Sequence, residues 1–138
     1  TGYTTGEDIL NARIDAVYAA GFGTYAIDAT TVTDNPGNYH IVNYWPESEY
    51  LNPGHIPGAY NYVPGQSLTL STDLKTLPTD KTIVVYCYTG QGSAFLCAYL
   101  GVLGYDARSL KFGANSMFHG DLPTSNWTTD NIKDYAYE

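Results

Sequence analysis

The residue of this chain best placed to do chemistry is Cys87, which lies between an apolar run and a glycine-bearing loop. The run, residues 83–86, is rich in β-branched residues and too short for a helix, so it predicts a buried parallel strand. From Ala94 onward the residues favour a helix, and Gly104 is a typical C-cap. The pattern therefore places a thiol between the end of a strand and the beginning of a helix.

The loop after Cys87 predicts a site that stabilises negative charge. The first N–H groups of a helix have no intrahelical partner and carry partial positive charge, which favours a thiolate or an oxyanion in front of them. Glycines in the loop allow a tight turn that gathers several N–H groups around one centre. The residues expected to form this cradle with their backbone are Tyr88, Thr89, Gly90, Gln91, Gly92 and Ser93.

Composition limits the kind of protein that carries this thiol. At 138 residues and 43% hydrophobic content, the chain is long enough for one domain with a core. Fourteen acidic residues against six basic ones give a net charge of −8, which argues against a nucleic-acid partner. The sequence has no apolar stretch of about 20 residues, so we expect no membrane span. A start without methionine, abundant tyrosine and scarce lysine favour an exported or cell-envelope protein over a cytoplasmic one.

The two cysteines, Cys87 and Cys97, are too few for a disulfide scaffold and lack the paired spacing of a zinc site. We therefore expect no metal site, and no cofactor. Cys97 falls among leucines in the predicted helix, so we expect an inert core thiol there; a redox pair with Cys87 is the alternative.

The remaining elements alternate between strands and helices. Thr5 is a predicted cap for a helix that runs to about Ala20, with one apolar face that needs a partner. Alternating strands and helices indicate a parallel sheet covered on both faces. Other strands are expected at 25–28, 40–45, 60–63 and 106–112, short helices at 46–50, 68–77 and after 113, and a polar turn segment at 30–38.

Two motifs together resemble the rhodanese-like (sulfurtransferase) family. The stretch Gly54–Ala59, GHIPGA, is followed about thirty positions later by the apolar strand that ends in Cys87. Glu49 and Tyr50 before it, and LGYDA at 103–107 with FGA at 112–114, fit the same pattern. The resemblance covers roughly residues 40–122. Residues 1–138 are therefore expected to form a single rhodanese-like domain, with 1–23 as an N-terminal helical extension.

The resemblance implies a three-layer α/β fold with a central parallel sheet of about five strands and helices on both faces. It also implies that Cys87 is the nucleophile, which accepts a sulfane sulfur, becomes a persulfide and passes that sulfur to a thiophilic acceptor. The N–H groups of residues 88–93 would hold the thiolate and the persulfide. The implied partners are a small-molecule or protein-bound sulfur donor and a thiol acceptor.

The sequence departs from the family pattern where cations are expected. Many active members carry arginines where this chain has Tyr88 and Gly92, so we expect a donor other than simple thiosulfate. The usual Asp-Val-Arg is Asn43–Trp45 here, which removes a charge pairing toward Glu49. A catalytically weak or inactive binding or regulatory module is therefore the alternative function. Related phosphatases end the loop in an arginine, which this chain lacks.

We also expect particular roles for several other residues, some of them at the carboxyl end of the sheet, where Cys87 lies. Arg108 and Lys111, late in the last strand, would replace the missing loop cations only in part. Tyr88 and Gln91 are expected to line the entrance with their side chains. Among the histidines, His55 is expected to brace its turn, His40 has no visible partner, and His119 is expected at the surface, with an acid–base role as the alternative.

Overall fold

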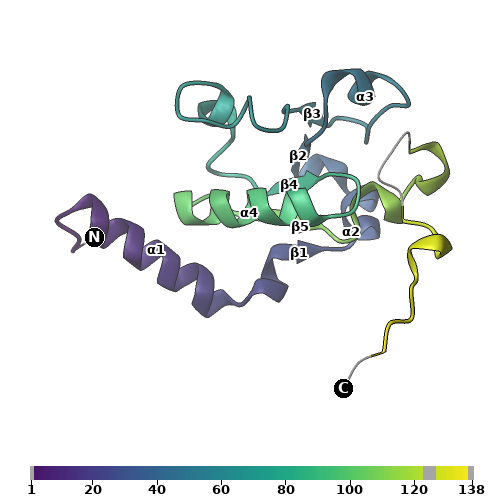
Figure 1. Cartoon of the computed structure of the whole chain (residues 1–138). Coiled ribbons are helices and arrows are strands. Elements are labelled where there is room, and N and C mark those ends of the chain that lie inside the picture. Colours follow the sequence, from purple (N-terminus) through teal and green to yellow (C-terminus); the bar gives the residue numbers. More distant parts are fainter. Residues whose placement is uncertain (1, 123–126, 137–138) are drawn as a thin grey trace.

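A five-stranded parallel sheet forms the centre of the protein (Figure 1). The computed structural model describes residues 2–122 and 127–136. All strand pairings are parallel, in the order β1-β5-β4-β2-β3. The strands are β1 (Ala26–Ile27), β2 (His40–Asn43), β3 (Tyr60–Asn61), β4 (Ile83–Tyr86) and β5 (Ala107–Leu110).

Strand β4 is the middle of this sheet and is buried along its whole length. Its register pairs Val85 with Val42 of β2 on one side and with Ser109 of β5 on the other. Burial on both faces explains why its sequence is a continuous apolar run instead of an alternating one. Because Cys87 directly follows β4, the buried strand fixes the position of the Cys87 backbone.

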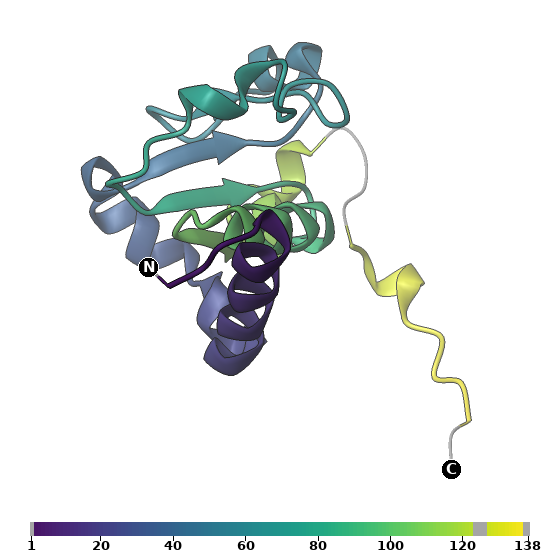
Figure 2. The ribbon, with the colours of Figure 1, turned by 90° about the vertical axis from the view of Figure 1, so that its left-hand side faces the viewer.

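Helices cover both faces of the sheet, so the three-layer α/β architecture is confirmed (Figures 1 and 2). Val84 and Tyr86 point into one core cluster with Val32 of the first covering layer. Val85 points into the second cluster, which contains Leu96 of the opposite layer. The helices are α1 (Gly6–Ala20), α2 (Ala29–Asp34), α3 (Glu47–Leu51) and α4 (Gln91–Leu103), joined by short 3-10 helices.

Helix α1 lies outside this sandwich and packs on α4 (Figure 2). Its N-terminus has the predicted cap: the Asp8 N–H donates to Thr5 Oγ1, and the Thr5 N–H donates to Asp8 Oδ2, each over 3.1 Å. An Arg13 guanidinium N–H donates to the carbonyl of Leu103 over 2.7 Å. None of residues 6–20 is fully buried, so α4 covers the apolar face of α1 only in part.

Two predicted segments differ from the structure. The polar segment 30–38 was expected as a turn, but α2 occupies most of it, because the buried Val32 anchors it to the core. The helix expected at 68–77 is reduced to the 3-10 helix Asp73–Thr76. In that segment the Thr72 hydroxyl donates to the Ser67 carbonyl and the Thr76 hydroxyl to the Asp73 carbonyl, which offers the backbone partners other than a helix.

The C-terminal segment 127–136 extends away from the sheet (Figure 2). It is attached near its start, where the Trp127 N–H donates to Asn115 Oδ1 over 2.9 Å. Among the helices of residues 2–122 and 127–136, none combines the length and hydrophobicity that a membrane crossing demands.

Candidate active site

Cys87 lies at the carboxyl end of β4, facing the first turn of α4. Only 7% of the residue is exposed, so the sulfur is recessed. The Ser93 N–H donates to Cys87 Sγ over 3.3 Å, and the thiol lies 3.7 Å from Ser93 Oγ. An N–H at the positive end of a helix stabilises sulfur in its thiolate form.

Helix α4 begins at Gln91 and not at the predicted Ala94, which corrects the description of the cradle. Gly90 takes a left-handed conformation, with φ of 93°, and its carbonyl accepts the first helical hydrogen bond, from Ala94, over 3.0 Å. Gln91, Gly92 and Ser93 are thus the first turn of the helix itself. The true loop is only residues 88–90, and half of the predicted cradle residues act as a helix N-terminus.

The loop is held from behind by the 3-10 helix Gly113–Ser116. The Ala114 N–H donates to the Cys87 carbonyl over 2.9 Å, and the Asn115 N–H donates to the Tyr88 carbonyl over 3.0 Å. The Asn115 side chain adds a second donor to the same Tyr88 carbonyl, over 2.8 Å. These bonds occupy two loop carbonyls and fix the backbone on which the thiol is mounted.

Gly113 is required for this contact, and its role was not predicted. Its φ is +55°, and a Cβ there would lie 2.4 Å from the Cys87 carbonyl oxygen and 2.7 Å from that of Tyr88. No larger residue fits without moving the loop. The sequence signal was present in the FGA stretch at 112–114, but a single sequence does not show which segment the glycine approaches.

Two serine hydroxyls connect the sulfur to the neighbouring strand. Ser93 Oγ lies 2.8 Å from Ser109 Oγ of β5, and both hydroxyls are within hydrogen-bond distance of the Gly90 carbonyl. Ser109 is almost fully buried. It is a second site residue that the sequence did not reveal, because its proximity to Ser93 depends on the β4–β5 pairing.

The Tyr88 side chain does not line the entrance, contrary to expectation. It stacks on Trp45, with ring centroids 4.8 Å apart and an interplanar angle of 14°. Trp45 is fully buried and also contacts Tyr86 and Phe118 edge to face. The position that holds an arginine in many relatives therefore carries a packing residue here. Gln91 is exposed, so its place at the entrance stays a prediction.

Neither cation of the last strand substitutes for the loop arginines. Arg108 pairs with Asp106 over 2.8 Å and donates to the Thr24 carbonyl over 2.9 Å. The Lys111 ammonium pairs with Asp28 over 3.0 Å. The positive potential that we can assign at Cys87 therefore comes from backbone N–H groups.

An uncharged network occupies the place where the resemblance implied an ion pair. The Asn43 amide and the Ile56 N–H both donate to the Tyr86 hydroxyl, over 2.9 and 3.1 Å. Asn61 in turn donates to Asn43 Oδ1 over 2.9 Å. Because Ile56 belongs to the GHIPGA turn, this network ties that turn to the strand that ends in Cys87. Glu49 Oε2 is buried without a hydrogen-bond partner in the described residues.

The structure also defines the contacts of the three histidines and the burial of Cys97. His55 stacks on Tyr50, and its Nδ1 lies 2.9 Å from the Tyr50 carbonyl oxygen, so it braces its turn as predicted. His40 has partners that the sequence did not show: its ring stacks on that of Tyr60, at 4.7 Å. His119 is exposed, and its ring contacts the Trp127 carbonyl. Cys97 is fully buried, which raises the pKa of its thiol to about 12.

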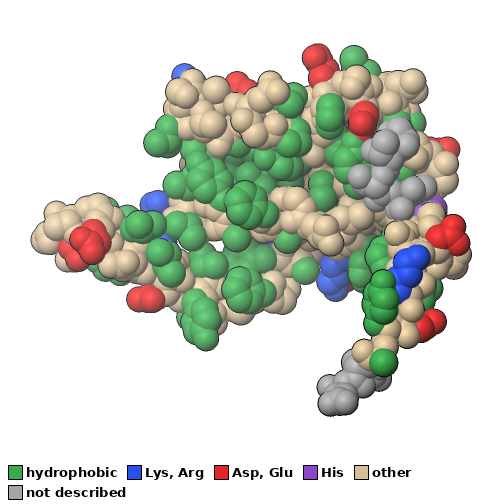
Figure 3. Space-filling view, viewed as in Figure 1, with side chains coloured by type: hydrophobic (Ala, Val, Ile, Leu, Met, Phe, Trp, Pro, Cys, Tyr) green, Lys and Arg blue, Asp and Glu red, His purple; other side chains and the backbone are tan. Residues whose placement is uncertain are grey.

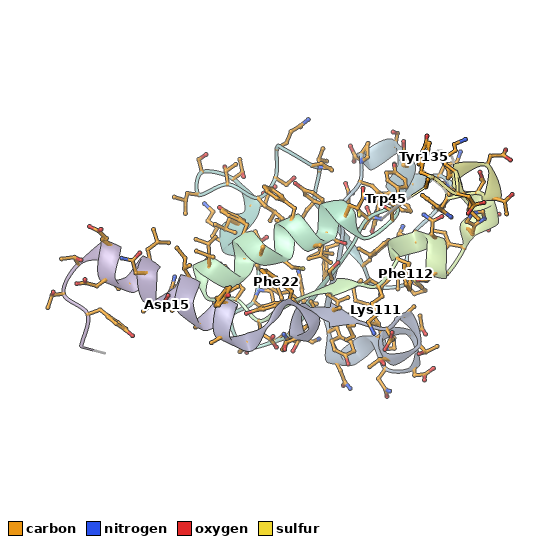
Figure 4. All side chains as sticks on the ribbon, turned by 60° about the horizontal axis from the view of Figure 1, so that its bottom comes forward. Asp15, Phe22, Trp45, Lys111, Phe112 and Tyr135 are labelled. Atoms are coloured by element: carbon orange, nitrogen blue, oxygen red, sulfur yellow. The ribbon has the colours of Figure 1, made fainter. Side chains whose placement is uncertain are left out.

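A cavity of about 330 Å³ adjoins the loop on the side of α1. Thr89 and Gly90 of the loop and Gln91 of α4 line it, together with Val17, Phe22 and Tyr25. Figure 4 shows Phe22 on the same side of α4 as Lys111 and Phe112, which also line the cavity. In Figure 3, hydrophobic side chains cover much of the face that α1 and α4 present.

The chain belongs to the rhodanese-like family. The family model, Rhodanese-like domain, matches residues 29–117, which is well over half of the chain. The match begins after α1 and the 3-10 helix Phe22–Tyr25, so these elements lie outside the part that the family model describes.

Solved structures support this assignment. The chain is similar to a rhodanese-related protein from Thermoplasma volcanium, with 26% identity and a TM-score of 0.61, covering 71% of this chain and 94% of that one. A protein from Lactobacillus plantarum shares 24% identity over 82% of this chain and 96% of its own, with a TM-score of 0.57, so this likeness concerns the fold alone.

A third similar structure carries a different description. It is a protein of unknown function from Rhodopseudomonas palustris, described as a possible tyrosine phosphatase. Its identity is 18%, its TM-score 0.58, and the match covers 88% of this chain and 96% of that one, so the likeness concerns the fold alone. A search of curated proteins gave no match.

Proposed function

We propose that the protein is a sulfurtransferase that carries sulfane sulfur on Cys87. The observation that carries this proposal is the hydrogen bond from the Ser93 N–H to Cys87 Sγ at the N-terminus of α4. A nucleophilic sulfur must be a thiolate, and the helix end supplies the charge stabilisation without a basic side chain. Membership of the rhodanese-like family agrees with this chemistry.

The reaction has two balanced steps. The Cys87 thiolate attacks the outer sulfur of a donor persulfide; a new S–S bond forms, and the donor thiolate leaves. An acceptor thiolate then attacks the outer sulfur of the Cys87 persulfide, forms its own S–S bond and releases the Cys87 thiolate. No net oxidation occurs, because one sulfur atom moves between thiols. The first-turn N–H groups of α4, from Gln91 to Ser93, would hold the charge in both states.

The proposed donor is an organic or protein-bound persulfide and not thiosulfate. A small dianion gains most from a bidentate guanidinium, and residues 88–93 contain none. Arg108 and Lys111 are already paired with acidic side chains. The net charge of −8 further disfavours approach of a free dianion. We do not propose phosphatase activity, because the same loop offers no arginine for phosphate.

The deciding experiment is intact-protein mass spectrometry after incubation with polysulfide and with glutathione persulfide. We expect a gain of one sulfur atom that cyanide removes. Cys87→Ser should abolish the adduct, whereas Cys97→Ser should retain it because that thiol is buried. Failure of all these donors to add sulfur to Cys87 would refute the proposed activity.

The second candidate function is a binding or regulatory module without turnover, and Tyr88 and Gly92 favour it. With these residues in place of arginines, the site could hold an anion or a partner without turnover. This binding module predicts ordinary thiol reactivity at Cys87 and no transfer of sulfur. The rate of iodoacetamide modification against pH separates the two functions, because a Cys87 thiol that titrates near the unperturbed value of about 8.5 argues against an activated nucleophile.

A further inference from the structure

We propose that the cavity beside the loop binds the apolar part of a small uncharged thiol, which accepts sulfur from Cys87. This inference rests on the proposed sulfur transfer and specifies the acceptor. In the transfer, the acceptor thiol loses its proton to solvent, and its thiolate attacks the outer sulfur of the Cys87 persulfide. The product is the acceptor's persulfide, and the Cys87 thiolate is restored.

One wall of the cavity comes from a part of the chain that the family model does not match. Val17, Phe22 and Tyr25 form its outer wall, and all three precede residue 29. Small residues of α4 make room beneath them: Ala94 and Ala98 line the cavity. The segment from α1 to β1 thus adds a binding feature to the common fold.

Close packing at one end keeps this wall in place. A Cβ on Gly101 would lie 3.4 Å from Val17 Cγ2 and 3.5 Å from the Tyr25 ring, so α1 approaches α4 closely there. Arg13 fixes the same helix pair through its bond to the Leu103 carbonyl. The part of the cavity at Ala94 and Ala98 therefore lies between two helices, α1 and α4, that are held together by direct contacts.

The walls favour an uncharged, apolar ligand. Aromatic rings of Phe22, Tyr25 and Phe112 surround the space. The cation at its edge, Lys111, is already neutralised by Asp28 over 3.0 Å, so a ligand carboxylate would have to compete with an existing ion pair. A volume of about 330 Å³ is at the lower end of small-molecule sites and is too small for a docked helix.

The cavity shares a wall with the sulfur cradle. Gly90 and Ser109 line it. From there, Ser109 Oγ contacts Ser93 Oγ over 2.8 Å, and the backbone N–H of Ser93 donates to Cys87 Sγ. Cys87 itself does not line the cavity, so the acceptor sulfur must reach the persulfide past residues 89–91, which do. A thiol whose apolar body occupies the cavity is held next to this segment, which raises its effective concentration near Cys87.

Phe22 and Phe112 give the cavity an aromatic mouth. Their exposed fractions are 75% and 72%, which is high for phenylalanine side chains. A ligand that entered between them would cover apolar surface that water now contacts. Apolar surface is thus left open at the place where the proposed acceptor enters.

The kinetic test uses benzyl mercaptan as the apolar acceptor and 2-mercaptoethanol as the small polar one, with Cys87 loaded beforehand. Ala98→Leu fills the cavity one helical turn away from the cradle. We expect it to raise the benzyl mercaptan concentration that gives half the maximal rate of transfer about tenfold, and to leave that of 2-mercaptoethanol unchanged. Ala19→Leu, the same change on α1 outside the cavity, should change neither. Equal effects of Ala98→Leu on both acceptors would overturn the inference.

A binding test separates this inference from the proposed activity. Benzyl mercaptan is titrated into the Cys87→Ser protein, and binding is followed by NMR as changes in the amide chemical shifts of residues around the cavity. We expect saturable binding that weakens in Phe22→Ala, whose exposed side chain makes folding failure a minor concern. Absence of saturable binding overturns the cavity site even where Cys87 takes up sulfur. Saturable binding with no sulfur uptake by Cys87 upholds the cavity as an apolar thiol site and refutes the activity instead.

Discussion

The backbone N–H of Ser93 points at the sulfur of Cys87 and donates to it over 3.3 Å. This relationship needs no cationic side chain, because the partial charge comes from the first turn of α4. Its geometry depends on β4, on the start of α4 that follows it, and on the more distant 3-10 helix Gly113–Ser116.

Replacing Gly113 should damage the site through the backbone. Gly113→Ala forces a Cβ against the Cys87 carbonyl and into a left-handed conformation, and we expect a loss of at least about 1–2 kcal/mol in the free energy of unfolding. The rate of Cys87 alkylation should fall as well. Urea unfolding and iodoacetamide kinetics measure the two effects. Gly120→Ala is the matched control, since nothing lies within 4 Å of its Cβ, and comparable losses in both variants would contradict the assigned role.

Restoring one loop cation should create thiosulfate activity. A Cβ at position 92 would lie 3.6 Å from Cys87 Sγ, an ordinary contact, so the side chain of Gly92→Arg starts beside the sulfur without a clash at its Cβ. A charge-assisted hydrogen bond of about 1.5–3 kcal/mol corresponds to roughly 10–100-fold in rate. Transfer from thiosulfate to cyanide is the assay, with Gly92→Gln as the uncharged control. Equal activity of the two variants would show that the missing charge is not what excludes thiosulfate.

Alkylation of the folded protein should be confined to Cys87. Burial raises the pKa of the Cys97 thiol to about 12, so its thiolate is scarce at pH 8 and the sulfur is also inaccessible. Peptide mapping after iodoacetamide treatment at pH 8 should show modification of Cys87 alone, and modification of both thiols after unfolding in urea. Fast labelling of Cys97 in the folded protein would mean that the core cluster of Val85, Leu96 and Cys97 opens transiently to solvent.

His40 should make stability depend on pH. Burial, and then the nearby Lys81, lower the pKa of His40 in the folded state, so the unfolded chain binds the proton more tightly. Its contribution is complete above the unfolded value of about 6.5 and is lost as the pH falls below it. His40→Phe keeps a ring to stack on Tyr60 but does not titrate. Urea unfolding from pH 8 to 5 should show a steeper loss for the natural protein than for this variant.

Local sequence was enough to predict the central part of the fold. The β-branched run before Cys87 defines β4, and the glycine-rich loop with the small-residue stretch after it defines α4. The beginning of α4 was placed at Ala94, because glycine and serine are poor helix formers. In the structure they occupy the first turn, where exposed N–H groups are useful and interior propensity matters less.

The partners of the site were beyond the reach of one sequence. Ser109 and Gly113 approach the loop only because β5 pairs with β4, a contact between distant segments. The Tyr88 stack on Trp45 depends likewise on two strands that end at the same edge. Sequence patterns identify which residues are buried, but they do not show which buried residues meet.

The stack of Tyr88 on Trp45 places a tryptophan, whose fluorescence can be measured, next to the residue that follows Cys87. Trp45 is fully buried and contacts the residue that follows Cys87, whereas the other indole, Trp127, is 59% exposed. Buried and solvated indoles emit at different wavelengths, so the blue component of the fluorescence reports on Trp45. In the proposed reaction, uptake of a sulfane sulfur moves the negative charge from Cys87 Sγ to the outer sulfur of the persulfide, which changes the local field near Tyr88 and the ring stacked on it. We therefore expect the Trp45 emission to report sulfur loading in real time, without a label or a coupled reagent.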